Sequence, residues 1–295
     1  MTISDVYTRY QEPVKVGRIS YINVAPIYYD FDYGLKPPWL DMFSAPPSVL
    51  NHMMSSELLD ISPVSSVAYA EHCSEWLLLP DLSVSCMGRV MSVVLASHLP
   101  FEMLHNKKVM LTDDSASSAK LIELLFSLNH ITPLFKKGTI KTSEDIDEDA
   151  SAVLVIGDAA LNINWSRQYD YVWDLGSMWK QLKDLPFVFS VWAVRKSFAE
   201  RRPEVVSSVI ELFHLSKKKG TKEIERVIVS GVEKLGIDTA VCRKYYKKLC
   251  YDFGELQKKG LISFFDDLFK EHLISKKVRL SFFQNDLHSS LDKKR

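Results

Sequence analysis

Cysteine is scarce in this chain, and the few cysteines present lack the spacing of a metal site. The 295 residues contain four, Cys73, Cys86, Cys242 and Cys250, with no C-x-x-C pair among them. The eight histidines include no H-E-x-x-H and no other clustered metal pattern. We therefore expect reduced thiols, as in a cytosolic protein, and neither a structural nor a catalytic metal.

Long apolar runs are missing too. No stretch reaches the ~18 apolar residues that a membrane span needs. Residues 1–13 are polar and contain Asp5, Arg9 and Glu12, where a signal peptide would have its apolar core. These absences predict a soluble, cytoplasmic protein without a membrane partner.

The chain also carries no net charge. Its 37 lysines and arginines balance 37 aspartates and glutamates, which argues against a nucleic-acid binder. Basic residues outnumber acidic ones after position 200, but they alternate with apolar residues in helix-like segments such as Arg243-Lys244. A solvated helix face explains that pattern better than a nucleic-acid groove does.

Hydrophobic residues make up 46% of the sequence, enough for a substantial core in one large domain or two lobes. The order of strands and helices favours two α/β lobes, with the chain crossing near residues 95–99 and again near 186–192. Lobe I would comprise residues 14–96 and 193–285, lobe II residues 97–192, and residues 1–13 and 286–295 would be flexible tails. The predicted strands cover residues 14–19, 59–61, 81–85, 90–96, 108–112, 135–140, 152–156 and 187–194; the predicted helices cover 49–58, 67–76 and 119–128, with mostly helix after 197.

A polar turn follows the first predicted strand and contains Ser20 and Asn23. In α/β sheets, ligands bind beyond the carboxyl ends of the strands. Asn23 can donate and accept hydrogen bonds but has no charge, so it suits orienting a substrate better than removing a proton.

Serine-rich turns recur farther along the chain. Ser65 or Ser66 would cap a helix, and capping alone is as good an explanation as ligand binding. Ser92 lies in an apolar strand, where its hydroxyl either bonds to backbone or points at a ligand. The run Ser115-Ala116-Ser117-Ser118 begins another helix, where free N–H groups favour phosphate or carboxylate. Asp158 is a candidate helix cap and, less favoured, a ligand for a substrate hydroxyl.

Taken together and in order, these turns resemble the chorismate dehydratases of the futalosine route to menaquinone. The matching pieces are Arg18-Ile19-Ser20-Tyr21-Ile22-Asn23, Leu59-Asp60-Ile61-Ser62-Pro63-Val64-Ser65-Ser66, Pro80-Asp81-Leu82-Ser83, Ile156-Gly157-Asp158-Ala159-Ala160-Leu161 and Leu185-Pro186-Phe187-Val188-Phe189. The resemblance implies a two-lobed α/β fold like that of type II periplasmic binding proteins, with a ligand cleft between the lobes.

The resemblance also implies a reaction, the cofactor-free elimination of water from chorismate to give 3-[(1-carboxyvinyl)oxy]benzoate. Asn23 and Ser92 fall on the family's active-site Asn and Ser. Substrate contacts implied by the match are Ser20, Ser65, Ser66, Ser85, Ser115, Ser117, Ser118, Asp158, Pro186 and Phe187. No His or Glu lies in the matched turns. The resemblance implies that the substrate's own side-chain carboxylate takes the proton.

Two positions depart from the family pattern. Lys183-Asp184 stands where Thr-Gly is usual, and Ser115-Ala116-Ser117-Ser118 replaces Ser-x-Thr-Ser. A related dihydroxynaphthoate-forming enzyme shares the fold, but its Pro-Cys-Pro-Asn-Asp turn is missing after the first strand. A non-catalytic binding protein for a small carboxylate has the same architecture, and fold alone does not separate it from an enzyme.

Overall fold

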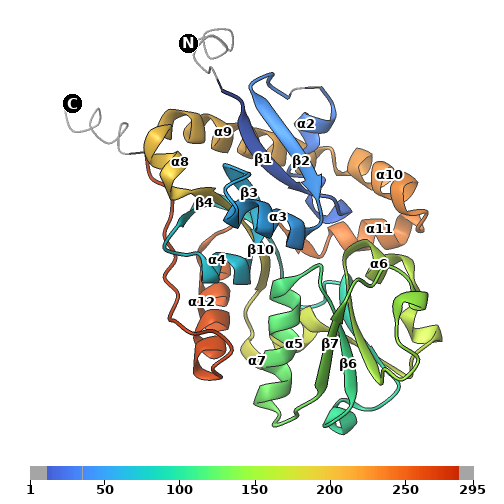
Figure 1. The fold of residues 1–295 in the computed structure, drawn as a ribbon. Coiled ribbons are helices and arrows are strands. Elements are labelled where there is room, and N and C mark those ends of the chain that lie inside the picture. The colour runs from blue at the N-terminus through green and yellow to red at the C-terminus, as the bar shows by residue number, and fades with distance from the viewer. Residues whose placement is uncertain (1–11, 35, 286–295) are drawn as a thin grey trace.

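Two α/β lobes, one above the other in Figure 1, make up the computed structural model. It describes residues 12–34 and 36–285, so the predicted tails lie almost wholly outside the described residues. Each lobe has its own sheet, with helices packed against it.

The first lobe is built on a six-stranded sheet with the order β11-β4-β10-β3-β1-β2. β1 runs parallel to β2 and β3, whereas β10 runs antiparallel to both β3 and β4. The strands are β1 (Val14–Ile19), β2 (Leu40–Ala45), β3 (Ile61–Ser65), β4 (Trp76–Cys86), β10 (Phe187–Arg195) and β11 (Leu249–Cys250).

A five-stranded sheet with the order β7-β6-β8-β5-β9 forms the second lobe. β6 is parallel to β7 and β8, and β5 is antiparallel to β8 and β9. The strands are β5 (Val93–Ser97), β6 (Lys108–Thr112), β7 (Leu134–Gly138), β8 (Ala152–Ile156) and β9 (Tyr171–Asp174).

Most of the helices follow a strand and return the chain along its lobe. None of those in the described ranges is both long and apolar enough to cross a membrane. The α-helices are α2 (Tyr29–Asp32), α3 (Pro47–Ser55), α4 (Ser66–Glu71), α5 (Ala116–Leu128), α6 (Gly157–Asn162), α7 (Leu175–Lys183), α8 (Lys196–Arg201), α9 (Pro203–Lys222), α10 (Ile224–Leu235), α11 (Thr239–Tyr246) and α12 (Glu255–Lys270); the 3-10 helices are η1 (Ile22–Val24), η2 (Phe101–Leu104), η3 (Ser143–Asp145) and η4 (Trp165–Arg167).

The chain passes between the sheets earlier than the sequence suggested. β5 pairs along its whole length with β8, so it belongs to the second sheet. β10 pairs with β3 and β4, so it belongs to the first. The passages therefore lie within residues 87–92 and 184–186, instead of at the expected boundaries after residues 96 and 192. Each of these two buried β-runs pairs with strands of a single sheet.

Three predicted elements differ from the structure in a way that bears on the site. Residues 81–85 are part of the longer strand β4, which runs through Pro80. The ladder between β4 and β10 is irregular at Pro80, so the N–H that proline lacks is not needed for pairing there. The predicted strand 59–61 is replaced by β3, which begins at Ile61. Residues 90–92 form a loop before β5 and not a strand.

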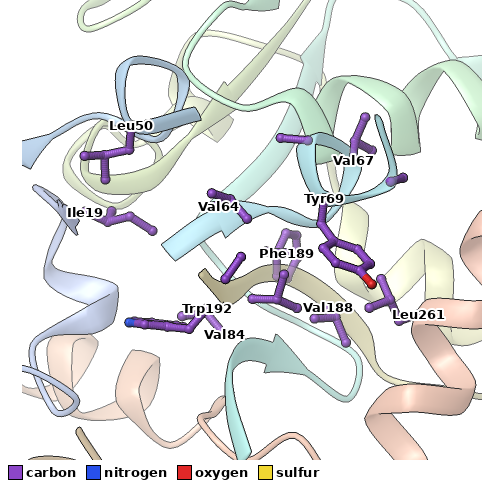
Figure 2. Close-up of a cluster of buried hydrophobic side chains, with 14 of the residues drawn as sticks. Ile19, Leu50, Val64, Val67, Tyr69, Val84, Val188, Phe189, Trp192 and Leu261 are labelled. Atoms are coloured by element: carbon purple, nitrogen blue, oxygen red, sulfur yellow. The ribbon is translucent and has the colours of Figure 1, made fainter. Parts of the chain in front are cut away.

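Buried apolar side chains from β3, β4 and β10 form the centre of the first lobe (Figure 2). Val64, Val84 and Trp192 are each no more than 1% exposed there. Removing a buried aromatic side chain of this kind costs about 3–5 kcal/mol. The core thus holds the strand ends that carry the site in fixed positions.

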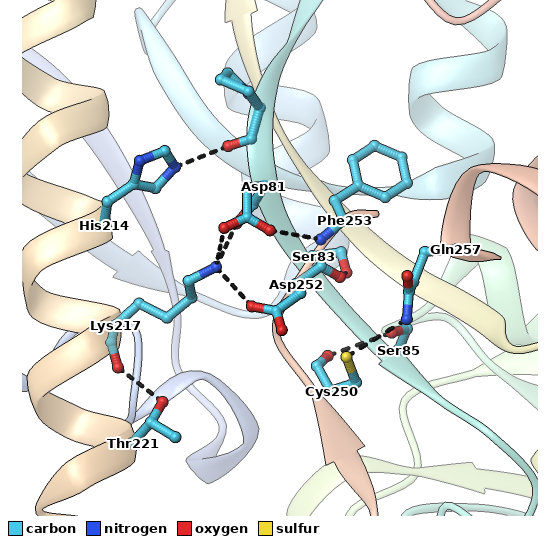
Figure 3. Close-up of polar contacts among 11 residues, drawn as sticks. Asp81, Ser83, Ser85, His214, Lys217, Thr221, Cys250, Asp252, Phe253 and Gln257 are labelled. Carbon is cyan, nitrogen blue, oxygen red and sulfur yellow. Dashed lines mark hydrogen bonds and ion pairs between the residues drawn. The ribbon is translucent and has the colours of Figure 1, made fainter. Parts of the chain in front are cut away.

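A buried lysine ties α9 to the interruption in β4 (Figure 3). Lys217 Nζ lies 2.7 Å from a carboxylate oxygen of Asp81 and 2.9 Å from one of Asp252. Burial raises the pKa of Asp81, but hydrogen bonds from Lys217 and from the Phe253 N–H outweigh it, so that the pKa is lowered. Asp81 also has φ of 53°, an uncommon backbone conformation for a non-glycine residue, which the network holds in place.

Candidate active site

A cavity between the two lobes brings together the polar turns of both. The lining residues are Tyr21, Asn23, Pro47, Ser65, Val84, Val90, Ser92, Val93, Ser115, Ser118, Ile156, Gly157, Phe189, Ser190, Tyr245 and Leu249.

Asn23 lies in η1, the single turn that follows β1, and faces this cavity. Its side-chain oxygen Oδ1 is buried and has no hydrogen-bond partner within the described part of the chain. An unpaired buried acceptor costs about 1–3 kcal/mol. A ligand that donates a hydrogen bond to Asn23 would recover that free energy.

Asp158 holds the turn that carries Asn23. Its carboxylate accepts a hydrogen bond of 3.1 Å from the Ile22 N–H and lies 3.4 Å from Lys234 Nζ. Burial raises the pKa of Asp158, although the Ile22 N–H and Lys234 both act to lower it. Asp158 is not a lining residue, and it does not cap its own helix α6, whose N-cap is Ile156. It fixes a turn of the opposite lobe instead.

Ser92 is held from several sides in the loop before β5. Its hydroxyl accepts a hydrogen bond of 3.1 Å from the Tyr245 hydroxyl, and its carbonyl accepts one of 2.8 Å from the Gly157 N–H. The Val90 and Met91 N–H groups donate to Asp174. These bonds explain why residues 90–92 leave the strand pattern that their apolar sequence predicted.

Three further predicted serines line the cavity. Ser65 caps α4, and its hydroxyl oxygen accepts from the Ala68 N–H and from Asn51 Nδ2, at 3.1 Å each. Ser115 caps α5, accepts from the Ser118 N–H at 3.2 Å and donates to the Ser118 hydroxyl at 3.0 Å. Ser65 and Ser118 lie in different lobes, and the hydroxyl oxygen of each accepts a hydrogen bond from the protein. Each can therefore point its own hydrogen at an anion in the cavity.

Ser66 and Ser117 bind each other and not the cavity. Their hydroxyls lie 2.8 Å apart, and Ser117 also accepts from the Val67 N–H at 3.2 Å. Neither residue lines the cavity. The structure therefore brings neither of these two expected contacts to the cavity, because their hydroxyls are engaged with each other.

Four other predicted contacts also lie outside the cavity. The Ser20 carbonyl accepts from Lys234, and the Ser85 hydroxyl donates to the Cys250 carbonyl at 3.3 Å. The Pro186 carbonyl accepts from the Trp179 indole at 3.2 Å, and the Phe187 ring packs against Trp179 and Phe264. Ser85 and Phe187 belong to the sheet and core. Ser20 and Pro186 make these contacts through their backbone, and the Ser20 N–H also donates to the Ala45 carbonyl at 3.0 Å.

Phe189 and Ser190 reach the cavity in place of Phe187. Both line it although they are neighbours in one strand, whose side chains normally alternate between faces. The ladder between β10 and β4 is irregular between Val188 and Ser190, and a bulge of this kind re-aims side chains. No sequence signal marked that irregularity.

Tyr21 and Tyr245 are the two tyrosines of the lining. The Tyr21 hydroxyl donates to Asp114 at 2.9 Å, which joins the first lobe to the second. Burial raises the pKa of both phenols. Tyr21 stands next to the predicted turn and could have been included, whereas only the fold brings Tyr245 to it.

The described residues hold no group of three or more His, Cys, Asp or Glu side chains that could bind a metal ion. The four cysteines are free thiols, and none lines the cavity. The chemistry of the cavity is thus that of hydroxyls, one amide and apolar walls.

Comparisons with known proteins show which family the chain resembles over most of its length. A family model described as menaquinone biosynthesis matches residues 14–270. The chain is 29% identical over 275 residues to the chorismate dehydratase of Thermus thermophilus, which covers 87% of this chain and 95% of that protein.

Solved structures with the same fold are more distant in sequence. A protein of Archaeoglobus fulgidus superposes with a TM-score of 0.74 at 15% identity, over 90% of this chain and 100% of that one. The periplasmic aliphatic sulphonate binding protein of Escherichia coli gives a TM-score of 0.63 at 13% identity, over 94% and 99%. The chain therefore has the two-lobed periplasmic-binding-protein fold that its sequence predicted.

Proposed function

This chain belongs to the menaquinone biosynthesis family, as its sequence predicted, and we propose that it is a chorismate dehydratase. The reaction removes the ring hydroxyl of chorismate and a proton from the neighbouring carbon as water. The product is 3-[(1-carboxyvinyl)oxy]benzoate. Because the ring becomes aromatic, the driving force lies in the substrate. The protein therefore has to bind chorismate, orient it and release the product.

The absence of a base from the cavity is the observation that supports this reaction best. Among the described residues that line it, none is a histidine, lysine, aspartate or glutamate. The two tyrosines have raised pKa values, so both stay protonated at neutral pH. A reaction in which the substrate's own side-chain carboxylate accepts the proton fits such a cavity.

The hydroxyls of both lobes suit the two carboxylates of chorismate. Ser65 offers a hydrogen from the first lobe and Ser118 one from the second. Hydrogen bonds from preorganised donors to carboxylates are among the stronger ones in proteins. Binding across the cleft would hold the ring between the lobes.

Asn23 and Ser92 are proposed to act on the leaving hydroxyl. The Oδ1 of Asn23, which has no partner among the described residues, would accept the hydrogen of a substrate hydroxyl and so fix the direction of that hydroxyl. Ser92 would donate a hydrogen bond to the oxygen as the carbon–oxygen bond breaks, keeping its own proton, and so stabilise the developing charge. The proton carried by the substrate carboxylate then completes the water molecule.

Incubation of the purified protein with chorismate tests the proposal, with the aromatic product measured by chromatography and mass spectrometry. We expect turnover by the natural sequence, and losses on the order of 10²-fold or more in kcat for Asn23→Ala and Ser92→Ala. Ser83→Ala is the matched control, since Ser83 is a buried serine that does not line the cavity and is not among the expected substrate contacts.

Two results would contradict the proposal in different ways. Folded natural protein that forms no product would end the dehydratase assignment. Normal turnover by both cavity variants would leave the activity but end the assignment of these residues. Chorismate binding without product would favour the alternative, a binding protein for a small carboxylate. The cytoplasmic location stays a prediction from the sequence.

A further inference from the structure

A tyrosine from the C-terminal part of the chain makes the side-chain contact to Ser92. Tyr245 lies in α11, 153 residues after Ser92, and its hydroxyl is 3.1 Å from the serine hydroxyl. The tyrosine is 1% exposed and the serine 5%. Both line the cavity.

The direction of this hydrogen bond decides what Ser92 can do. Each hydroxyl has one hydrogen and can also accept. Burial raises the pKa of Tyr245, so its phenol keeps its hydrogen, and the contact has the geometry of a tyrosine donor. With its oxygen occupied by that donor, Ser92 is left to direct its own hydrogen elsewhere, and its side chain faces the cavity.

We propose that Tyr245 is a positioning residue for the dehydration: by donating to Ser92 Oγ, it turns the serine hydrogen toward the leaving hydroxyl of the substrate. The proposal rests on the proposed function. It extends an arrangement seen at Ser65 and Ser118, whose oxygens also accept from the protein and whose hydrogens are free for an anion.

The backbone of Ser92 is fixed independently of Tyr245. Asp174 accepts hydrogen bonds from the Val90 and Met91 N–H groups at 3.0 and 2.7 Å, and Gly157 donates to the Ser92 carbonyl at 2.8 Å. Met91 is held at φ of 70°, a conformation costly for a non-glycine residue. Loss of the Tyr245 hydroxyl should therefore free the rotation of the serine hydroxyl without moving the loop.

The expected effect falls on kcat and not on KM. In the proposed binding mode Ser65 and Ser118 hold the substrate carboxylates, so Tyr245→Phe should leave KM within about twofold. Loss of the directed hydrogen bond from Ser92 raises the activation free energy by about 0.5–1.5 kcal/mol, which corresponds to a fall of roughly 2- to 12-fold in kcat.

A double-mutant cycle provides the test. The rates of the natural protein, Tyr245→Phe, Ser92→Ala and the double variant are measured with chorismate, with product accumulated over hours so that slow variants are quantified. If Tyr245 acts through Ser92, its substitution lowers kcat in the natural background and has no effect when Ser92 is already alanine. Tyr251→Phe is the matched control, because Tyr251 is a buried tyrosine whose hydroxyl has no partner among the described residues.

Each other outcome overturns the inference. Unchanged kcat in Tyr245→Phe means that the hydroxyl does not position the serine. An equal fall in both backgrounds means that Tyr245 acts without Ser92, as a merely structural residue would. No turnover by the natural protein removes the proposed function and the inference with it, whereas normal turnover with an uncoupled cycle removes the inference alone.

Discussion

The hydroxyls of Ser66 and Ser117 lie 2.8 Å apart and join the first turn of α4 in one lobe to that of α5 in the other. Both are fully buried. The contact stands beside the cavity, whose lining includes Ser65 and Ser115 from the same two turns. In each of the two turns, at least one serine lines the cavity and a nearby serine makes the contact between the lobes.

Substitution of this pair should weaken the protein in a non-additive way. Ser66→Ala removes one hydrogen bond, and Ser117→Ala also leaves the Val67 N–H without its acceptor at 3.2 Å. We expect losses of about 1 kcal/mol and about 1–3 kcal/mol in the free energy of unfolding. The double variant should lose less than the sum, measured by urea denaturation; simple additivity would mean that the two hydroxyls do not interact.

Gly157 is expected to tolerate no side chain because Tyr21 covers it. A Cβ there would lie 2.9 Å from the Tyr21 ring, on a backbone with φ of 63°. Gly157→Ala should destabilise the protein and displace Tyr21 from Asp114. Gly236→Ala is the control, since Gly236 has φ of 66° and nothing within 4 Å. That control loses only the ~1–2 kcal/mol of backbone strain. Equal losses in urea denaturation would contradict a role for the Tyr21 contact.

The carboxyl of Asp158 should make stability depend on pH in an unusual direction. Burial raises its pKa, so the folded state holds this proton more tightly than the unfolded state does. The resulting stabilisation is complete below the ordinary aspartate pKa and is lost as pH rises through the folded-state value. Asp158→Asn abolishes this dependence while keeping an acceptor for the Ile22 N–H.

Urea denaturation of both proteins between about pH 3.5 and 7 measures the effect. The stability of the natural protein relative to Asp158→Asn should fall as pH rises and then become constant. A difference that grows with pH would mean that Lys234 and the Ile22 N–H outweigh burial.

The opposite pH dependence is expected at Asp81, the partner of Lys217. The pKa of Asp81 is lowered, because hydrogen bonds from Lys217 and the Phe253 N–H outweigh its burial. Its stabilisation is therefore present above the ordinary aspartate pKa and is lost as pH falls through the folded-state value. Lys217→Met should lose roughly 1–3 kcal/mol near neutral pH and show a weaker acid dependence.

Lys218→Met is the matched control, since Lys218 is the exposed neighbour on the same helix. It should change the free energy of unfolding by less than about 0.5 kcal/mol. Similar losses in both variants would show that the Lys217 network contributes no more than a surface charge does.

Local patterns were enough to predict the parts of the site that lie at the ends of strands and starts of helices. Asn23 follows β1, whose bounds the apolar alternation predicted to the residue. Ser65 is one of the two serines expected to cap α4. Ser115 caps α5, which begins at Ala116, three residues before the expected start at residue 119. All three line the cavity. Such signals are carried by a few consecutive residues.

The expectations that differ from the structure depend on contacts between distant parts of the chain, which no short segment of sequence contains. Ser66 and Ser117 looked equivalent to their neighbours, and which hydroxyl faces the cavity is set by how the lobes meet. Phe189 replaces Phe187 because of an irregular register with a distant strand. Tyr245 lies in a basic helical segment whose contact with Ser92 exists only in the folded chain.

The place of β10 in the first sheet has a consequence for synthesis of the chain. β10 lies between β3 and β4, yet the whole second lobe is translated before it. Until residue 195 has left the ribosome, β3 and β4 each present an unpaired strand edge, the kind of surface that aggregates. The cavity between the lobes, whose lining extends to Leu249, can therefore form only after both lobes have been made.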